Sequence, residues 1–415
     1  MFRGKSFYRN RLCILILMML VVGTLVACGQ KKDAGTEENK SEENTSEEVS
    51  VEDTEKDTEA MADENTGSEK VNNTKENAEN KTEAELKEMF GENCIADQTF
   101  EVELSEYSGK VYFVPFAPSG DKPDFHMQII QDGEVLDNIS AYIPEELENE
   151  KFTSLDAVSF WDVNYDDNTD IVLIQTYGTT TFAAIYYGFS ADAEDYERFF
   201  YSEDELSKKV TSQVDELTIP KIRSYLTDGK KNGEFVSYEE AYEARSRLSE
   251  LESNSEYAYD LIYFDEDEIP ELVVADNGYF VSLYTFSDGK LYTLMERWPY
   301  GAGGNVGYEY SPGKNSLRNY NQDYAGAVVY TTYMTIGKSH SMDEVVQIKT
   351  LHFDDANGNG EPDEGETESA YSYSVSNSYI DGVAATQEEC ETYDVGGYEY
   401  IQGSMDLDTL LRRLK

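Results

Sequence analysis

The chain contains the stretch Val158-Ser-Phe-Trp-Asp-Val-Asn-Tyr-Asp-Asp-Asn-Thr-Asp-Ile-Val-Leu-Ile174, which shows the pattern on which its folded part is built. An apolar segment enters, acidic or amide side chains follow at every second position, and a second apolar segment leaves. Short apolar runs that are bounded by turn residues are typical of buried strands. The stretch therefore predicts two strands joined by an acidic loop.

The same order of features returns later in the chain. Tyr257–Phe264 is a predicted strand, Asp265–Glu271 is an acidic turn, and Leu272–Ala275 is the next strand. Matching Asp166 to Asp267 predicts an internal duplication with a period of about a hundred residues. Three dipeptides are strong hairpin signals, namely Asp132-Gly133, Asn277-Gly278 and Asp288-Gly289.

These patterns predict an α+β, β-rich fold with two antiparallel-sheet meander modules and a few flanking helices. We place the first module at residues 82–228 and the second, which carries a calcium-type loop, at residues 229–415. Helix starts are expected where capping residues precede apolar residues at helical spacing. These capping residues are Thr82, Ser202, Thr218, Ser237 and Ser404.

Residues 1–27 have the features of a signal peptide. A basic segment precedes the apolar run Leu12–Val26, which is shorter than a normal membrane span. The run ends in Leu-Val-Ala-Cys28, which resembles the lipobox of bacterial lipoproteins. This resemblance implies cleavage before Cys28, a diacylglycerol on its thiol, and a lipid-anchored protein on the extracytoplasmic face of the cell membrane. The alternative is an ordinary signal peptide followed by a chance cysteine.

Residues 28–81 are almost all Glu, Asp, Lys, Asn, Thr and Ser. Such a segment cannot bury enough apolar surface to offset its chain entropy. We therefore expect a disordered acidic linker that separates the folded modules from the membrane.

The formal net charge is −51, and removal of residues 1–27, with four basic and no acidic residues, would bring it to −55. Nucleic acids and anionic lipid surfaces bind positive charge, so the composition excludes them as partners. It favours divalent cations and basic partners. Besides Cys28, the mature chain would hold Cys94 and Cys390, which could form a disulfide or remain two separate thiols.

The clearest chemical motif is Asp355-Ala-Asn-Gly-Asn-Gly-Glu-Pro-Asp-Glu-Gly-Glu366. It matches the calcium-loop pattern D-x-[DN]-x-[DN]-G-x5-E of EF-hands, in which oxygen ligands surround a hard cation. Pro362 lacks the N–H through which paired EF-hands bond, so we expect one unpaired site at a hairpin tip. Its predicted calcium ligands are Asp355, Asn357, Asn359, Glu361 through its carbonyl, Asp363 and Glu366.

Two other loops carry fainter forms of this motif. The first resembles the turns of FG-GAP-type modules and dockerin-like loops, with Asp167 where a glycine is usual; its predicted weaker metal ligands are Asp162, Asn164, Asp166, Asn168 and Asp170. The second, Asp265–Glu271, resembles D-x-D-G-D-G-x-P-E-L turns of lipoproteins from Gram-positive gut bacteria. Tyr263 replaces its first aspartate, so we interpret it as a turn that kept its geometry and lost its ion.

Catalytic motifs are weak. His126, His340 and His352 belong to no catalytic pattern. The sequence therefore favours a calcium-stabilised, non-enzymatic binding or scaffold protein of the cell envelope, whose partners are the membrane, calcium and a glycan or envelope protein. The alternatives are a secreted hydrolase acting on glycans and a solute-binding transport subunit. For glycan binding, the candidate stacking residues are Trp298, Tyr300, Tyr308 and Tyr310, which serve equally well as strand residues.

Overall fold

The computed structural model describes residues 81–120, 122–189, 199–364, 366, 374–380 and 382–415. All of them belong to one compact unit of the chain, Lys75–Lys415. The predicted signal peptide, Cys28 and the acidic linker up to residue 80 lie outside the described residues.

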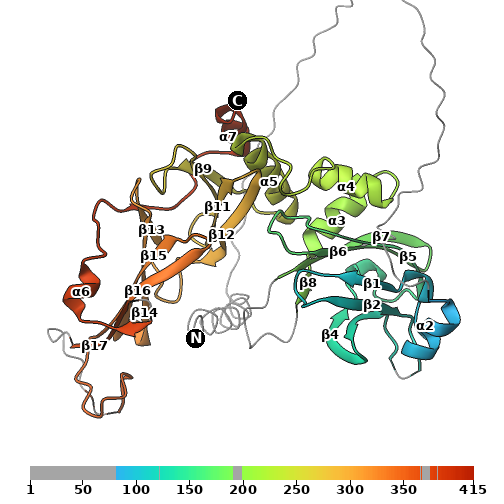
Figure 1. Ribbon diagram of the computed structural model, residues 1–415, viewed down its shortest axis with the longest axis horizontal. Coiled ribbons are helices and arrows are strands. Elements are labelled where there is room, and N and C mark those ends of the chain that lie inside the picture. The colour runs from blue at the N-terminus through green and yellow to red at the C-terminus, as the bar shows by residue number, and fades with distance from the viewer. Residues whose placement is uncertain (1–80, 121, 190–198, 365, 367–373, 381) are drawn as a thin grey trace, which may run out of the picture. The chain divides into compact units, whose positions relative to one another are not determined.

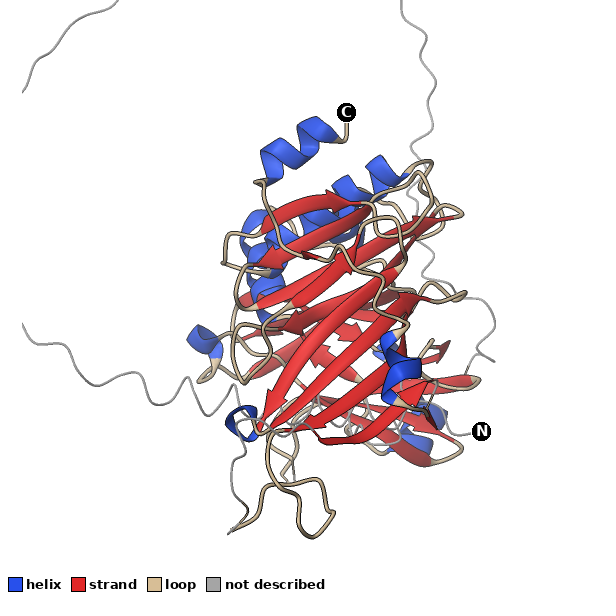
Figure 2. Cartoon of the chain, turned by 90° about the vertical axis from the view of Figure 1, so that its left-hand side faces the viewer, coloured by secondary structure: helices blue, strands red, loops and turns tan. Residues whose placement is uncertain are grey.

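Strands dominate the described chain, as Figures 1 and 2 show, and they form four antiparallel sheets. Sheet one contains β1 (Phe100–Glu103), β2 (Lys110–Phe116), β3 (His126–Gln131) and β4 (Glu134–Ser140). Sheet two contains β5 (Phe152–Trp161), β6 (Asp170–Tyr177), β7 (Thr180–Gly188) and β8 (Phe200–Ser202). The predicted β-rich fold is confirmed, with four sheets in place of one meander per module.

The C-terminal half holds the other two sheets. Sheet three contains β9 (Ala258–Ile262), β10 (Glu271–Asp276), β11 (Phe280–Ser287) and β12 (Lys290–Pro299). Sheet four has the order β18-β17-β16-β15-β14-β13-β19. Its strands are β13 (Tyr308–Ser311), β14 (Ser316–Asp323), β15 (Val328–Ile336), β16 (Met342–Leu351), β17 (Ser374–Ile380), β18 (Val383–Ala384) and β19 (Glu399–Tyr400).

The helices are short. They are α2 (Glu83–Phe90), α3 (Asp204–Gln213), α4 (Ile219–Thr227), α5 (Tyr238–Glu252), α6 (Gln387–Glu391) and α7 (Leu407–Arg413), with 3₁₀ turns at Ala96–Gln98, Glu145–Leu147 and Tyr324–Gly326. None of these helices is both long and apolar enough to cross a membrane.

The capping predictions hold at some helices and fail at two. Thr82 forms the predicted capping box with Glu85, and Ser237 caps α5. The prediction for α3 is wrong, because Ser202 is the last residue of β8 and Glu203 occupies the N-cap. The last helix is capped by Asp406 instead of Ser404. Met405, just before this helix, instead forms an antiparallel backbone bridge with Tyr259.

Sheet two is buried on both faces, because alternate residues of a strand point to opposite sides. Val172 and Ile174 of β6 pack into a core that also includes α3, α4, α5, α7 and sheet three. Ile171 and Leu173 pack on the other side, against sheet one. The loop that joins β5 to β6 therefore begins and ends between two hydrophobic layers.

Sheets two and three share one plan. In each, four strands pair in chain order, and an acidic loop joins the first strand to the second. The second strand begins at Asp170 in one sheet and at Glu271 in the other, opposite the end of the preceding strand. This shared plan agrees with the repeated pattern in the sequence.

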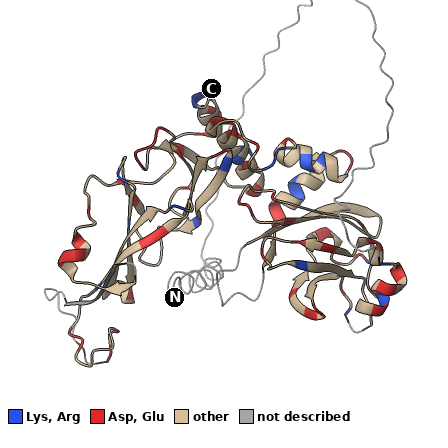
Figure 3. Ribbon diagram, viewed as in Figure 1, with Lys and Arg blue, Asp and Glu red and all other residues tan. Residues whose placement is uncertain are grey.

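Acidic residues are spread along the described elements, whereas Lys and Arg are fewer (Figure 3). The two cysteines that the sequence left open are separate, buried free thiols. Of the candidate sugar-stacking residues, Trp298, Tyr308 and Tyr310 are buried, which agrees with the alternative that they serve as strand residues. Their rings fill space between strands.

Candidate metal-binding loops

The loop between β5 and β6 folds around its own acidic side chains. Asp162 accepts hydrogen bonds from the backbone N–H groups of Asp166 and Asp167, both at 3.0 Å. In two further hydrogen bonds, a side chain accepts from the N–H group two residues later. Asn164 Oδ1 accepts from Asp166 N–H at 3.2 Å, and Asp166 Oδ1 accepts from Asn168 N–H at 2.8 Å. The oxygens at loop positions 1, 3 and 5 are thus drawn toward the inside of the loop.

Asp170, at the end of this loop, holds its two ends together. Its side chain is fully buried and accepts from Val163 N–H at 2.6 Å and from Gly188 N–H at 2.9 Å. These bonds join the start of the loop, the start of β6 and the end of β7. The carboxylate is therefore a structural clamp as well as a candidate metal ligand.

Asp167 replaces the glycine that such loops usually carry. The backbone of Asp167 adopts φ = +64°, the left-handed conformation that Asp tolerates better than most residues. Lys290 binds its carboxylate at 2.8 Å, and the Asn232 side chain donates to it at 3.2 Å. The turn therefore closes without glycine, supported by contacts from residues far along the chain.

The electrostatic state of this loop is unusual. Burial, followed by the charge of Asp166, raises the pKa of Asp162 to about 7. Burial likewise raises the pKa of Asp166 and lifts that of Asp170 well above its ordinary value. Within the described chain, no Lys or Arg forms a salt bridge with these three carboxylates. Buried carboxylates without a counter-ion are costly, and a bound dication is one way to offset them.

The loop between β9 and β10 repeats the arrangement without a carboxylate at its first position. Asp265 Oδ1 accepts from Asp267 N–H at 3.0 Å, and Asp267 Oδ1 accepts from Ile269 N–H at 2.8 Å. Glu271, which is fully buried, accepts from Phe264 N–H at 2.9 Å and from the Thr285 hydroxyl at 3.1 Å. Burial raises the pKa of Glu271 to about 8.

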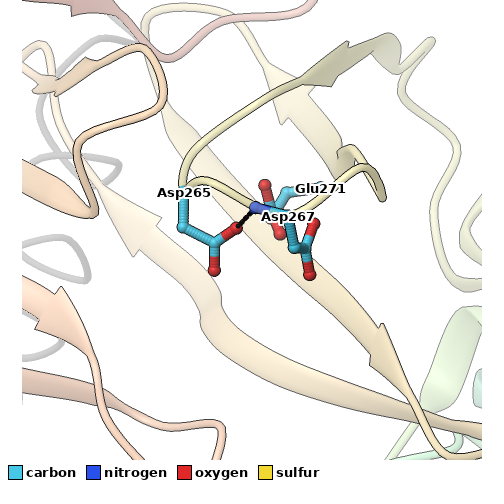
Figure 4. Close-up of side chains that lie close together, drawn as sticks. All are labelled: Asp265, Asp267 and Glu271. Atoms are coloured by element: carbon cyan, nitrogen blue, oxygen red, sulfur yellow. Dashed lines mark hydrogen bonds between the residues drawn. The ribbon is translucent and has the colours of Figure 1, made fainter.

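One oxygen each from Asp265, Asp267 and Glu271 lies within 4.8 Å of the other two. Figure 4 shows these three side chains close together in the loop. Sequence reasoning gave this loop a lesser role because Tyr263 stands at its first position. The alignment of Asp166 with Asp267 contained the missing signal, since it also pairs Asn164 with Asp265 and Asp170 with Glu271.

The third loop, Asp355–Glu366, has the most complete motif and the least burial. Asp355 accepts from Gly358 N–H at 2.8 Å and from Gly360 N–H at 3.0 Å. Asn357 accepts from Asn359 N–H, and Asn359 accepts from Glu361 N–H, both at 2.9 Å.

Its last residues close the ring. Glu366 accepts from Ala356 N–H at 2.9 Å and from Asp363 N–H at 3.0 Å. Asp363 accepts from the side-chain amides of Asn357 and Asn359. The strands β16 and β17, which pair antiparallel, lie on either side of this segment. This is the hairpin context that the sequence predicted, although residues 365 and 367–373 lie outside the description.

The three histidines lie in separate surroundings. His126 stacks on Phe116 at 5.1 Å, and His340 stacks on Tyr292 at 4.4 Å. His352 follows the end of β16, where its N–H donates to Ala327. The ring contacts of His126 and His340 are packing contacts with aromatic side chains.

The arrangement of the loops is suited to holding hard cations through carboxylate, amide and carbonyl oxygens. Comparison of the chain with models of known protein families, with curated proteins and with solved structures finds no match.

Proposed function

We propose that this protein is a lipid-anchored extracytoplasmic binding or scaffold protein of the cell envelope, stabilised by calcium. The observation that carries the calcium part is the β5–β6 loop, where three carboxylates that lack a salt bridge are held inside a calcium-type turn. In this loop, Asp162, Asn164 and Asp166 would hold the ion, with Asn168 and Asp170 completing the set. Calcium supplies the positive charge that the chain lacks there.

The loop Asp355–Glu366 is the second proposed site. Its hydrogen bonds orient oxygens from Asp355, Asn357 and Asn359, and Glu366 closes the ring. Exposed sites of extracellular proteins typically bind calcium at roughly 10⁻⁴ to 10⁻³ M. Both sites would therefore fill in a calcium-rich exterior and link folding to the location of the protein.

Calcium titration of thermal unfolding tests this proposal. The chain from residue 29 onward should melt a few degrees higher in about 5 mM calcium, because an ion that binds only the folded state stabilises it. Asp162→Ala with Asp166→Ala should remove most of the rise, and Asp355→Ala with Glu366→Ala should remove the remainder. Magnesium at equal ionic strength is the control, and an unchanged melting curve in calcium refutes the proposal.

The membrane part of the proposal depends on Cys28 and the apolar run before it. In a bacterial host, the full chain should be labelled by radioactive palmitate and should sediment with membranes. Cys28→Ala should abolish both. Labelling that persists in this variant would place the lipid elsewhere.

A further inference from the structure

A polar pocket lies apart from the three loops, where sheets two and three meet α5. Its volume is about 30 Å³, roughly the space of two or three buried waters. Charged and aromatic side chains line it from β8, the start of α3, α5, β11 and β12. Two structural features of this lining indicate a binding site: a bulge in one strand and a set of charged side chains.

The first feature is a β-bulge in β12. Val281 pairs with Trp298 and Leu283 pairs with Met295, so that Ser282 faces both Glu296 and Arg297. The Ser282 hydroxyl accepts from Arg297 N–H at 2.9 Å, and Arg297 adopts φ = +46°. A bulge redirects side chains and is common beside binding sites, and a non-glycine residue in this conformation carries strain that its surroundings must hold. The bulge brings Glu296 and Arg297 to the pocket.

The second feature is the set of charged side chains. Arg245 of α5 donates to both carboxylate oxygens of Glu252, at 3.1 and 2.9 Å, and this pair is almost fully buried. Arg297 donates to the Tyr257 hydroxyl at 3.0 Å and stacks over Phe280 at 4.1 Å. Glu203, Glu252 and Glu296 line the pocket together with these two arginines, so acidic groups face it beside basic ones.

Glu203 is the lining carboxylate to which the described residues donate no hydrogen bond. It stands at the N-cap of α3, yet its side chain makes no capping bond. The residue is only partly exposed. Burial, and next the charge of Glu252, raises its pKa to about 8, whereas Arg297 acts in the opposite direction. No Lys or Arg of the described residues forms a salt bridge with Glu203, so a bound cation is one way to hold it ionised.

The walls indicate what kind of cation fits. Tyr201, Tyr257 and Phe280 contribute aromatic surface beside the acidic groups. Aromatic faces and a carboxylate together favour an organic ammonium, because the rings attract the charge and cover the carbon stem. A calcium ion would need six to eight oxygens, whereas an ammonium group needs only a few hydrogen-bond acceptors. We propose that this pocket binds the primary ammonium group of a small organic amine, with Glu203 as its ionic partner.

Isothermal titration with n-butylammonium tests the assignment, using the chain from residue 29 onward. Calcium is fixed at about 5 mM throughout, so that the outcome does not depend on filling of the metal sites. We expect saturable one-to-one binding, and no binding of butyrate, which has the same carbon stem with the opposite charge. Glu203→Gln should weaken binding at least tenfold, since a hydrogen bond to a charged group is worth about 1.5–3 kcal/mol.

Asp204→Asn is the matched control, because it removes one negative charge from the same helix end at an exposed residue. It should change the affinity less than about twofold. Tyr201→Leu should weaken binding by a smaller factor than Glu203→Gln, since it removes one aromatic face and keeps the charge. Thermal unfolding of each variant, without amine, confirms that it is folded.

Two comparisons complete the test. Potassium chloride that binds as tightly as n-butylammonium, or butylammonium affinity that is unchanged in Glu203→Gln, overturns the proposal. A blocked lysyl tripeptide distinguishes the sources of the ammonium group. Tighter binding of the peptide assigns the pocket to a lysine of a partner protein, and tighter binding of butylammonium assigns it to free amines.

Discussion

The β5–β6 loop and the β9–β10 loop occupy the same position in two similar sheets, and they differ in where their carboxylates stand. Three hydrogen bonds are equivalent in the two loops, and their acceptors are Asn164, Asp166 and Asp170 in the first and Asp265, Asp267 and Glu271 in the second. At the first position, however, Asp162 is replaced by Tyr263, whose side chain is 52% exposed. The later positions therefore suffice to shape the turn, and the first position decides only whether a carboxylate stands at its start.

Burial of the closing carboxylate separates these two loops from the third. Asp355–Glu366 has the same kind of backbone bonds, but its residues are mostly exposed, so water screens their charges. Asp170 and Glu271 are fully buried, and solvent cannot stabilise their ionised forms. A motif read from residue types alone does not contain this difference. The predictions below change one of these variables at a time.

The largest effect is expected where a buried acceptor is removed. Asp170→Ala leaves the N–H groups of Val163 and Gly188 without a partner and should cost about 3–4 kcal/mol of unfolding free energy. Glu271→Ala should cost less, about 2–3 kcal/mol, because the Thr285 hydroxyl can turn to another acceptor. Urea unfolding without calcium measures both. Equal losses would show that the two clamps are energetically equivalent.

The next effect is a loss of stability at alkaline pH. It comes from Glu203, a mostly buried carboxylate that lies outside the three loops. The pKa of Glu203 is about 8 in the folded protein, above its unfolded value near 4.5. Its contribution is thus fully present below pH 4.5 and is lost as the pH rises through 8. Unfolding free energy should fall by about 2 kcal/mol between pH 5 and 9 from this group. Glu203→Gln should remove that part of the decline, and an identical slope in the variant contradicts the assignment.

A smaller effect is expected from a substitution that makes the β9–β10 loop more like the β5–β6 loop. Tyr263→Asp supplies the missing first carboxylate at an exposed position, so the substitution itself costs little. It should add one calcium equivalent in titration calorimetry and about 1 kcal/mol of calcium-dependent stability. Tyr263→Asn is the matched control, with an oxygen but no added charge. An unchanged stoichiometry in Tyr263→Asp would show that charge at this position is not the deciding variable.

The smallest effect concerns the salt bridge between Lys290 and Asp167. Both side chains are partly exposed, at 39% and 44%, so the pair should contribute less than about 1 kcal/mol. Lys290→Met should leave calcium-free stability nearly unchanged and should tighten calcium binding slightly, because it removes a positive charge beside the loop. A calcium affinity that falls in this variant would indicate that Lys290 holds the turn in shape.

Much of the local structure could be predicted from the sequence. The hairpins at Asp132-Gly133 and Asp288-Gly289 form where they were predicted, because these dipeptides tolerate the left-handed backbone of a tight turn. Thr82 and Ser237 cap their helices for equally local reasons. The predictions at Ser202 and Ser404 failed because strand pairing extended over or beside those residues, and a local signal carries no knowledge of a distant partner.

The candidate sites show the same division. Residue types identified all three acidic loops, but they ranked the loop containing Asp265, Asp267 and Glu271 last, although its carboxylates lie within 4.8 Å of one another. The pocket around Glu203 left no pattern in the sequence. Its members come from β8, α5, β11 and β12, and only packing brings such distant segments together.

The sequence by itself determined the strand-and-loop pattern, the oxygen-rich turns and the strongly negative charge, because each depends on residue type and short spacing. The tertiary structure decided which carboxylates are buried and which lysine or arginine side chains lie beside them. It also decided that Arg297 lies near enough to Glu203 to affect its pKa. Burial and charge pairing depend on the residues that cover a group from elsewhere in the chain. An aspartate of the same motif is therefore solvated on one loop, whereas on another it is buried and its ionised form is costly.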